Sequence, residues 1–371
     1  MRAVVMAGGE GSRLRPLTSR RPKPLAPIAN RPVMHHIVDL LREDGITEIV
    51  ATLHYLADEI EAYFGDGSAM GVSMHYVVED TPLGTAGAVK MAQERLRDEP
   101  FVIISGDAMT DVDLGALIDA HRAAKNDATI ALWRVSNPLE FGVVITDVEG
   151  RITRFMEKPS WGEVFSDTIN TGIYVLEPEI LDYMEPGKNY DFSKDLFPRM
   201  LRDGKRLGGH VISDYWADVG NLQQYQQANY DALSGAVRTV RPDREIAPGV
   251  WVGADCQIDP SATLVAPVQL GDRVTIRANA TVEGPACIGN GSIVEARAAV
   301  RRSVLWEDVY VGTDAQLDDC TIANRTLIKE RVIVGEGTVI GERCTIGEGA
   351  VVRPHLKLWP EKNVSSGAIV S

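Results

Sequence analysis

The stretch VQLGDRVTIRANATVEGPACIGNGSIVEARAAV, residues 268–300, repeats one pattern every six residues. Each unit has an aliphatic residue, followed four positions later by a small residue or Val. Around this stretch the aliphatic series reads Val252, Ile258, Leu264, Leu270, Ile276, Val282, Ile288, Val294 and Val300, and after single-residue slips at Leu305 and Ile322 it continues to Val352. Such a period is typical of a parallel β-solenoid in which three flat faces make one coil. We therefore predict a β-helix over residues 249–356.

The residues before the repeat are organised differently, because short aliphatic segments alternate there with helical ones. Strands are expected at 3–5, 48–52, 73–78, 101–105 and 128–134, and helices at 35–41, 86–96, 114–124 and 222–233. This alternation predicts a Rossmann-like α/β domain over residues 1–236. After Phe141 the expected strands follow one another at shorter intervals, which indicates an extension of the sheet into a mixed one. The aperiodic, charged stretch 237–248 is the expected linker. A chain of 371 residues is long enough for two such domains.

Composition excludes several classes of partner. The formal net charge is -14 and the sequence pI is about 5.0, which disfavours nucleic acid and anionic membranes. No apolar run has the length of a membrane span and the N-terminus lacks the features of a signal peptide, so we expect a cytoplasmic protein. The four cysteines have no C-x-x-C spacing and are expected to be reduced, mostly buried thiols: Cys256, Cys287, Cys320 and Cys344.

A glycine-rich loop follows the first expected strand. It reads Ala7-Gly-Gly-Glu-Gly-Ser-Arg-Leu-Arg-Pro-Leu-Thr18, and Pro22-Lys-Pro-Leu25 comes shortly after. Its cations are Arg13, Arg15, Arg20, Arg21, Lys23 and Arg31, with no acid between them. Glycine amides and cations together make an outline phosphate site. A dinucleotide fingerprint would need a third glycine where Leu14 stands, and a P-loop would need Gly-Lys-Ser/Thr. The remaining alternative is a glycine turn beside a solvated basic face.

This loop resembles the signature of the nucleotide-diphosphate-sugar pyrophosphorylases. The resemblance implies that a sugar-1-phosphate oxygen attacks the α-phosphorus of a nucleoside triphosphate and expels pyrophosphate. It also implies that Arg13 and Lys23 act at the reacting phosphates and that Gly8, Gly9 and Gly11 bind the nucleotide together with Arg13. The segment Pro82-Leu-Gly-Thr-Ala-Gly87 resembles the family's base-recognition turn, which places Gly84 and Thr85 at the base.

Two aspartates match the metal-binding aspartates of that family. Asp107 follows the strand 101–105, and Asp218 follows Tyr215-Trp-Ala217. Strand ends of this kind line ligand crevices in α/β sheets, and nucleotidyl transfer needs Mg²⁺ on one or two carboxylates. The resemblance therefore implies a Mg²⁺ site at Asp107 and Asp218, with Asp107 also counted as catalytic. Taken alone, an aspartate after a strand is more often a cap or a turn residue, which is how Asp111 and Asp113 are interpreted.

Three further segments resemble the family's contacts to the sugar phosphate. In Glu157-Lys158-Pro159 the lysine would hold the phosphate and the glutamate the sugar hydroxyls. The backbone of Gly142 and the side chain of Asn170 are the other expected contacts. Without the resemblance, a surface ion pair explains Glu157 and Lys158 better, and ordinary strand ends explain Gly142 and Asn170 nearly as well.

Leu83-Gly-Thr-Ala-Gly87, Lys23-Pro-Leu25 and the repeat domain together look most like mannose-1-phosphate guanylyltransferases. The expected activity is thus formation of GDP-mannose from GTP and mannose 1-phosphate. Asn170-Thr-Gly172 and Phe192-Ser-Lys-Asp195 depart from the pattern of those enzymes. Glucose-1-phosphate thymidylyl-, adenylyl- or uridylyltransferases, and a catalytically silent subunit that binds nucleotide sugars, remain as alternatives.

For the repeat domain we expect a scaffold for homo-oligomerisation or for allosteric ligand binding. Acyltransferases built on such repeats need a histidine base, and no histidine occurs between Pro248 and Arg353. Removing the residues after Pro248 should then change the assembly state and leave the active site intact. Residues 357–371 are expected to be a tail that leads into a further domain.

Overall fold

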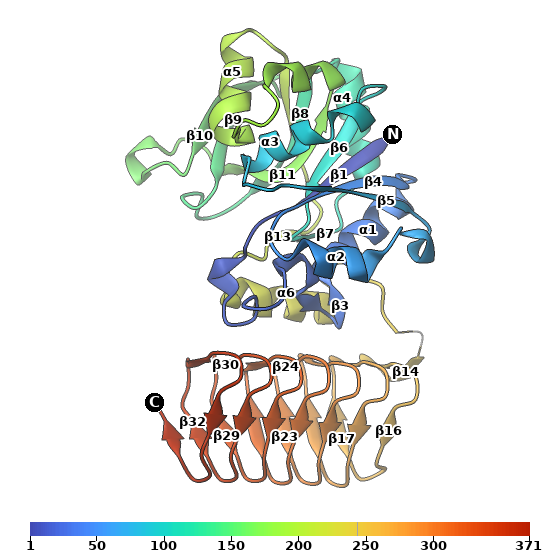
Figure 1. The fold of residues 1–371 in the computed structure, drawn as a ribbon, viewed down its shortest axis with the longest axis vertical. Coiled ribbons are helices and arrows are strands. Elements are labelled where there is room, and N and C mark those ends of the chain that lie inside the picture. Colours follow the sequence, from blue (N-terminus) through green and yellow to red (C-terminus); the bar gives the residue numbers. More distant parts are fainter. Residues whose placement is uncertain (243) are drawn as a thin grey trace. The chain divides into compact units, whose positions relative to one another are not determined.

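The structure is a computed structural model that describes residues 1–242 and 244–371. Its contacts divide the chain into two compact units (Figure 1). Met1–Glu10 and Met34–Asp218 form the first unit, and Gly11–Val33 and Val219–Ser371 form the second. The glycine-rich loop is thus shared, because its part after Glu10 packs with the β-helix unit. The domain limits at 236 and 249 remain a prediction from sequence.

The first unit is built on one mixed sheet. A parallel half is formed by β6 (Phe101–Ser105), β1 (Arg2–Ala7), β4 (Glu48–Leu53) and β5 (Ser73–Val78), in that order. Beyond β6 lies the antiparallel part, made of β11 (Thr168–Leu176), β9 (Gly142–Thr146) and β10 (Ile152–Glu157). β8 (Ala128–Arg134) branches from β11 as a further antiparallel strand, and β12 (Leu207–Val211) pairs in parallel with β8. The expected Rossmann-like layout with a mixed-sheet extension is confirmed.

The helices of this unit differ from the sequence prediction in two places. They are α1 (Val33–Glu43), α2 (Ala57–Phe64), α3 (Gly84–Met91), α4 (Leu114–Ala124) and α5 (Phe197–Arg202). The helix expected over 86–96 is wrong at both ends, because α3 begins at Gly84 and gives way to a 3₁₀ turn at Gln93–Arg95. The expectations did not include α2. It has two turns and begins after Leu56 without a side-chain cap, so it carries little sequence signal.

A short antiparallel ribbon brings two distant segments of the first unit together. β7 (Ala108–Thr110) pairs with β13 (Trp216–Asp218), and Asp218 lies opposite Ala108. Asp113 caps α4, since its carboxylate accepts the N–H of Ala116 at 2.8 Å, and Asp111 accepts the N–H of Tyr215 at 2.9 Å. The interpretation of Asp113 as a cap is confirmed, whereas the Asp111 carboxylate binds the backbone of a segment 104 positions later in the sequence.

The second unit contains the predicted β-helix, whose strands form three parallel sheets (Figure 1). One sheet holds β14 (Arg244–Ala247), which is antiparallel to its neighbour, and β15 (Val250–Val252), β18 (Val268–Leu270), β21 (Ala286–Ile288), β24 (Val304–Leu305), β27 (Thr321–Ile322), β30 (Val339–Ile340) and β33 (Lys357–Leu358). The next holds β16 (Gln257–Ile258), β19 (Thr275–Ile276), β22 (Ile293–Val294), β25 (Tyr310–Val311), β28 (Leu327–Ile328), β31 (Thr345–Ile346) and β34 (Asn363–Val364). The third holds β17 (Thr263–Val265), β20 (Thr281–Glu283), β23 (Ala299–Arg301), β26 (Gln316–Asp318), β29 (Ile333–Val334), β32 (Val351–Val352) and β35 (Ile369–Val370).

The six-residue period is the packing rule of this unit. Aliphatic residues of successive coils pair in register, as Leu270 does with Ile288, and they form one buried column. The slips in the sequence correspond to shortened coils, since Ile288 pairs with Leu305 and Leu305 with Ile322. The prediction of a tail over residues 357–371 is wrong, because β33, β34 and β35 continue the coils of the β-helix through residue 370.

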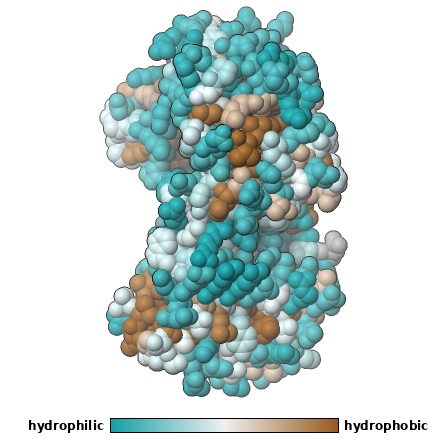
Figure 2. All heavy atoms as spheres, in the orientation of Figure 1, coloured by the Kyte–Doolittle hydropathy of each residue, from teal (hydrophilic) through white to brown (hydrophobic). Residues whose placement is uncertain are grey.

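The surface of the β-helix is mostly mixed in polarity. Figure 2 shows hydrophobic residues gathered at the end where the C-terminus lies, and Trp359 and Ile369 of the last coil are exposed. All four cysteines are free, and three of them are buried. None of the helices in the described parts of the chain has the length and apolar character that crossing a membrane requires.

Three more elements belong to the second unit. α6 (Leu222–Ser234) begins at Asn221, whose side chain caps it by accepting the N–H of Gln224 at 2.9 Å. β2 (Pro27–Ile28) and β3 (Arg31–Pro32) form a two-residue hairpin that no sequence pattern predicted. This hairpin directly follows Lys23-Pro-Leu25 and precedes α1.

Candidate active site

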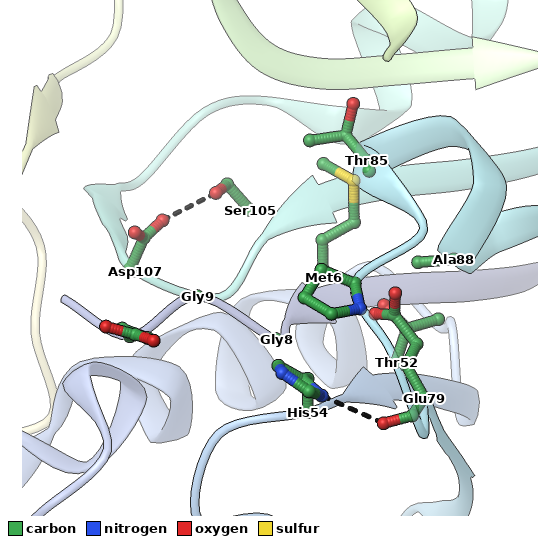
Figure 3. Close-up of a pocket in the computed structure, with 13 residues that line it drawn as sticks. Met6, Gly8, Gly9, Thr52, His54, Glu79, Thr85, Ala88, Ser105 and Asp107 are labelled. Atoms are coloured by element: carbon green, nitrogen blue, oxygen red, sulfur yellow. Dashed lines mark hydrogen bonds between the residues drawn. The ribbon is translucent and has the colours of Figure 1, made fainter. Parts of the chain in front are cut away.

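The carboxyl ends of the parallel strands enclose a cavity of about 410 Å³ (Figure 3). Five predicted site residues line it: Gly8, Gly9, Gly84, Thr85 and Asp107. The rest of the lining includes Met6, Thr52, His54, Glu79 and Ser105. Strand ends on one edge of an open α/β sheet are where ligands bind in this architecture. The cavity is large enough for a nucleotide-sized ligand.

Glu79 is a functional candidate that the sequence did not reveal. One carboxylate oxygen, Oε2, accepts the N–H of Leu83 at 2.7 Å, and the other, Oε1, lies beside Gly8. The side chain is almost fully buried in the cavity wall, and this burial raises the pKa of the Glu79 carboxyl. His54 is hydrogen-bonded through Nδ1 to the carbonyl of Glu79 at 2.8 Å. The position of Glu79 after strand β5 is the one signal that could have found it.

The predicted base-recognition turn is tightly packed. Gly84 has a φ of 72°, and a Cβ there would lie 2.5 Å from the carbonyl oxygen of Tyr190. The Tyr190 carbonyl accepts the N–H groups of Ala86 and Gly87 at 2.9 and 3.1 Å. Thr85 donates its hydroxyl to Asp191 at 3.1 Å. A larger residue at Gly84 would displace this turn, so its shape depends on glycine.

A second cavity, of about 200 Å³, lies beside the first and shares Ser105 and Asp107 with it. Asp218 lines this cavity, and the β7–β13 pairing explains why: Asp218 stands opposite Ala108, the neighbour of Asp107. The Ser105 hydroxyl donates to Asp107 Oδ1 at 2.5 Å and orients that carboxylate. The structure therefore brings the two predicted metal-binding aspartates to one cavity.

These residues suit Mg²⁺ better than a metal held by protein alone. Among residues 1–242 and 244–371, no three His, Cys, Asp or Glu side chains gather into a metal site. Mg²⁺ commonly takes one or two carboxylates and completes its octahedron with water and phosphate oxygens. Asp107 and Asp218 supply that number of carboxylates in a cavity that a phosphorylated ligand can enter.

Three of the four predicted sugar-phosphate residues line the second cavity: Gly142, Glu157 and Asn170. Strands β9 and β10 pair Gly142 with Glu157, and a Cβ at Gly142 would lie 3.0 Å from Glu157 Oε2. Glycine thus leaves room for the carboxylate. The pKa of Glu157 is raised, first by burial and then by Asp191. Asn170 is held by its own loop, with Oδ1 accepting the N–H of Gly172 at 2.9 Å.

Lys158 is placed differently from its predicted partners. Within the described residues, the lining of the second cavity includes Glu157 but not Lys158. Lys158 has a φ of 46°, which is strained for a residue with a side chain, and its N–H donates to the Phe141 carbonyl at 3.0 Å. The turn is therefore fixed, whereas the placement of the lysine at the sugar phosphate stays a prediction.

Gly11, Arg13 and Lys23 lie in the second unit and form a compact loop there. Gly11 has a φ of 60°, and a Cβ on it would be 2.8 Å from Lys23 Cβ. Thr18 closes the loop by donating its hydroxyl to the Gly11 carbonyl at 2.7 Å. Lys23 is buried and Arg13 is exposed. The fold thus brings Gly11 and Lys23 together, although twelve positions separate them in the sequence.

Comparisons with known proteins match both parts of the chain. The profile of a family described as "Nucleotidyl transferase" matches residues 2–235, and one described as "GMPPB C-terminal domain" matches residues 264–370. A UTP–glucose-1-phosphate uridylyltransferase of Synechocystis sp. is 36% identical over 340 residues, covering 88% of this chain and 88% of its own. A mannose-1-phosphate guanylyltransferase of Mycobacterium tuberculosis is 37% identical over 234 residues, covering 63% of this chain and 65% of its own.

Solved structures agree with these matches. The crystal structure of a putative glucose-1-phosphate thymidylyltransferase from Bacillus anthracis, in complex with a sucrose, superimposes with a TM-score of 0.58 at 28% sequence identity. The match covers 65% of this chain and 98% of that one. These relatives differ in the base and the sugar that their names give.

Proposed function

Because the chain belongs to the sugar-1-phosphate nucleotidyltransferase family, we propose that it makes GDP-mannose and pyrophosphate from GTP and mannose 1-phosphate, with Mg²⁺ as cofactor. The observation that carries this proposal is the position of Asp107, which lines both cavities. A nucleotide in the first cavity and a sugar phosphate in the second would meet at this residue.

The reaction requires positioning and charge neutralisation more than covalent chemistry. An oxygen of the sugar phosphate forms a bond to the α-phosphorus, and the bond from that phosphorus to the α,β-bridging oxygen breaks. Pyrophosphate leaves with the electron pair. The attacking oxygen is already anionic, so no side chain has to act as a nucleophile or remove its proton. The protein must hold two anions together, and neutralising their charge is the main task of the site.

Asp107 and Asp218 are the residues that would hold Mg²⁺, which supplies charge neutralisation at the transferring phosphoryl group. The hydrogen bond from Ser105 keeps the Asp107 carboxylate in one orientation. The cations Arg13 and Lys23 would act on the triphosphate from the glycine-rich loop. Glu157 and Asn170 would orient the sugar.

The choice of guanine rests on Glu79. An ionised carboxylate only accepts hydrogen bonds. The base-pairing edge of guanine carries two neighbouring donors, whereas that of uracil or thymine has one donor between two acceptors. With Oε2 occupied by Leu83, Oε1 remains directed to the region beside Gly8. A buried acceptor at this place favours guanine over the pyrimidines.

A second candidate is UTP with glucose 1-phosphate. The Synechocystis relative that carries this activity in its name covers 88% of the chain, more than the Mycobacterium guanylyltransferase does. The two proposals share the enzyme class and differ in the nucleotide that the first cavity would bind and the sugar phosphate that the second would bind.

The test is pyrophosphate release with Mg²⁺ across a matrix of nucleotides and sugars. GTP, ATP, dTTP, UTP and CTP are each combined with mannose 1-phosphate and glucose 1-phosphate. A dominant GTP and mannose 1-phosphate combination supports the proposal, and a dominant UTP and glucose 1-phosphate combination replaces it with the second candidate. No release anywhere, with nucleotide sugars still binding, would make the chain a silent binding subunit.

Replacing Glu79 by Gln is expected to weaken GTP binding by about 10- to 150-fold, since a hydrogen bond to a charged group contributes about 1.5–3 kcal/mol. The affinity for UTP should fall less, because the amide N–H of glutamine can donate a hydrogen bond to a carbonyl oxygen of uracil. Dissociation constants for both nucleotides measure this, with Glu94→Gln on an exposed surface as the matched control. Equal losses for the two nucleotides would mean that Glu79 does not select the base.

The pH dependence of GTP binding provides a separate check. Burial raises the pKa of Glu79, so this carboxylate is protonated at a higher pH than an ordinary glutamate. GTP affinity should therefore fall as the pH is lowered through that raised pKa, and Glu79→Gln should remove the dependence. The titration is run without sugar phosphate, because the pKa of Glu157 is also raised. A dependence that persists in Glu79→Gln would assign it to another group.

A further inference from the structure

The hairpin between β2 and β3 has an unfavourable turn that its surroundings stabilise. Its two central residues, Ala29 and Asn30, have φ values of 48° and 62°. Both signs are those of the tight turn that suits a two-residue hairpin, and asparagine adopts such angles readily. Alanine does not, so Ala29 is strained and needs external contacts to persist.

Two buried amide side chains hold Ala29 in place. Asn229 of α6 accepts the Ala29 N–H through Oδ1 at 3.1 Å. Gln269 of β18 donates from Nε2 to the Ala29 carbonyl at 2.7 Å. Ala29, Asn229 and Gln269 are all at most 3% exposed. Buried hydrogen bonds of this kind fix the geometry of the groups they join.

Asn30 is connected to the next coil of the β-helix. Its Nδ2 donates to the Ile288 carbonyl at 2.9 Å, and the Cys287 thiol donates to its Oδ1 at 3.0 Å. Cys287 is fully buried, and burial raises the pKa of its thiol to about 12, so the thiol keeps its proton at neutral pH. Both polar ends of the Asn30 amide are therefore occupied by strand β21.

The base of the hairpin has a third anchor. Tyr225 of α6 donates its hydroxyl to the Pro27 carbonyl at 2.5 Å and accepts the Trp306 indole N–H at 2.8 Å. Both aromatic side chains are buried. The Arg21 guanidinium lies over the Trp306 ring at 5.4 Å. Contacts from one helix and three neighbouring coils thus converge on residues 21–30.

The hairpin is joined to Lys23 through its backbone. The Val33 N–H donates to the Ala26 carbonyl at 3.0 Å, and the Ala26 N–H donates to the Lys23 carbonyl at 2.9 Å. Lys23 in turn packs against Gly11. A continuous set of short contacts therefore leads from Gln269 and Cys287, which lie outside the aliphatic column of the β-helix, to a predicted phosphate-binding cation.

We propose that the β-helix positions Lys23 for the triphosphate through this hairpin, so that Asn30, Cys287, Gln269 and Asn229 are positioning residues of the reaction. This inference rests on the proposed function of Lys23. It assigns the β-helix a part in nucleotide binding in addition to the oligomerisation scaffold expected from sequence. For removal of the residues after Pro248 it therefore predicts weaker nucleotide binding, whereas the expectation from sequence is an intact active site.

Asn30→Gly tests the proposal most directly, because glycine keeps the positive φ and removes both side-chain hydrogen bonds. Dissociation constants for Mg-GTP and for Mg-pyrophosphate should each rise about fivefold to tenfold, the scale of one lost hydrogen bond. The matched control is Thr338→Val. Thr338 is a buried β-helix residue whose hydroxyl donates to the Arg353 carbonyl at 3.0 Å, and its loss should lower Tm without changing either constant.

A double-mutant cycle separates positioning from general stability. In a Lys23→Met background, Asn30→Gly should cause no further loss of pyrophosphate affinity, because the group that it positions is gone. Cys287 gives a second route if Lys23→Met does not fold. Cys287→Ala should weaken pyrophosphate binding, and Cys287→Ser, which can still donate to Asn30, should restore it.

The outcomes distinguish this inference from the function on which it rests. Unchanged binding of both probes by Asn30→Gly, when the unsubstituted chain binds them, would overturn the positioning role alone. Equal losses in the Lys23 and Lys23→Met backgrounds would also overturn it. If the unsubstituted chain binds neither Mg-GTP nor Mg-pyrophosphate, the proposed function fails and the positioning role fails with it.

Discussion

Asp107→Asn is expected to reduce turnover by two or more orders of magnitude while leaving the fold intact. Asparagine has the size of aspartate but no charge, so the change removes half of the carboxylate charge that Asp107 and Asp218 would offer to Mg²⁺ in the proposed site. Losing a group that neutralises charge at a transferring phosphate costs about 3 kcal/mol or more in the transition state. Asp107 also lines both cavities, so the loss would affect each substrate.

The measurement is kcat for pyrophosphate release at saturating Mg²⁺, GTP and mannose 1-phosphate. Asp218→Asn should show a loss of similar size, since its position opposite Ala108 brings it to the same cavity. Asp113→Asn is the matched control, because Asp113 caps α4 and asparagine caps a helix equally well. Near-normal turnover in both Asp107→Asn and Asp218→Asn would exclude them as the metal ligands.

The β-helix was predictable from sequence because every coil repeats the same constraint. One aliphatic and one small residue must face the interior of each flat face, and a six-residue period in residues 252–352 records that requirement directly. The end of the solenoid was less visible. The six-residue series continues there through Leu358, Val364 and Val370, but these residues are only partly buried and exposed residues such as Trp359 stand among them. Strands β33, β34 and β35 nevertheless pair in register.

The candidate site was predictable where a motif follows a strand. Gly8, Gly84 and Asp107 come from different strand ends, and the parallel register brings them to one cavity. Glu79 was missed because a single glutamate carries no motif, and its importance comes from burial and from the hydrogen bond with Leu83. These are tertiary properties, which a periodic pattern does not record.

The grouping of the glycine-rich loop also required the structure. Its sequence runs without interruption from Gly8 to Lys23, which suggested that all of it belongs to the α/β domain. Its contacts divide after Glu10. The reason is visible in Asn30 and Ala29, whose polar groups are satisfied by α6 and by β-helix residues more than two hundred positions later. No local pattern could show that pairing.

Lys158→Ala is expected to raise the KM for the sugar 1-phosphate by roughly 10- to 150-fold and the KM for the triphosphate by much less. The reason is the loss of a charge-assisted hydrogen bond to the sugar's phosphate, worth about 1.5–3 kcal/mol. Lys158 follows Glu157 in a fixed turn, but its side chain is not among the residues that line the second cavity. The variant therefore tests whether that side chain reaches the substrate during the reaction.

The strained backbone of Lys158 calls for a second variant. Alanine at a φ of 46° is unfavourable, whereas glycine adopts that angle freely. If Lys158→Gly and Lys158→Ala raise the KM equally, the lysine side chain binds the sugar phosphate. If only Lys158→Ala is impaired, the turn geometry that holds Glu157 is the important feature. Lys188→Ala, which removes an exposed ion pair with Glu185, is the control. A larger effect on the triphosphate would mean that the two cavities hold the opposite substrates.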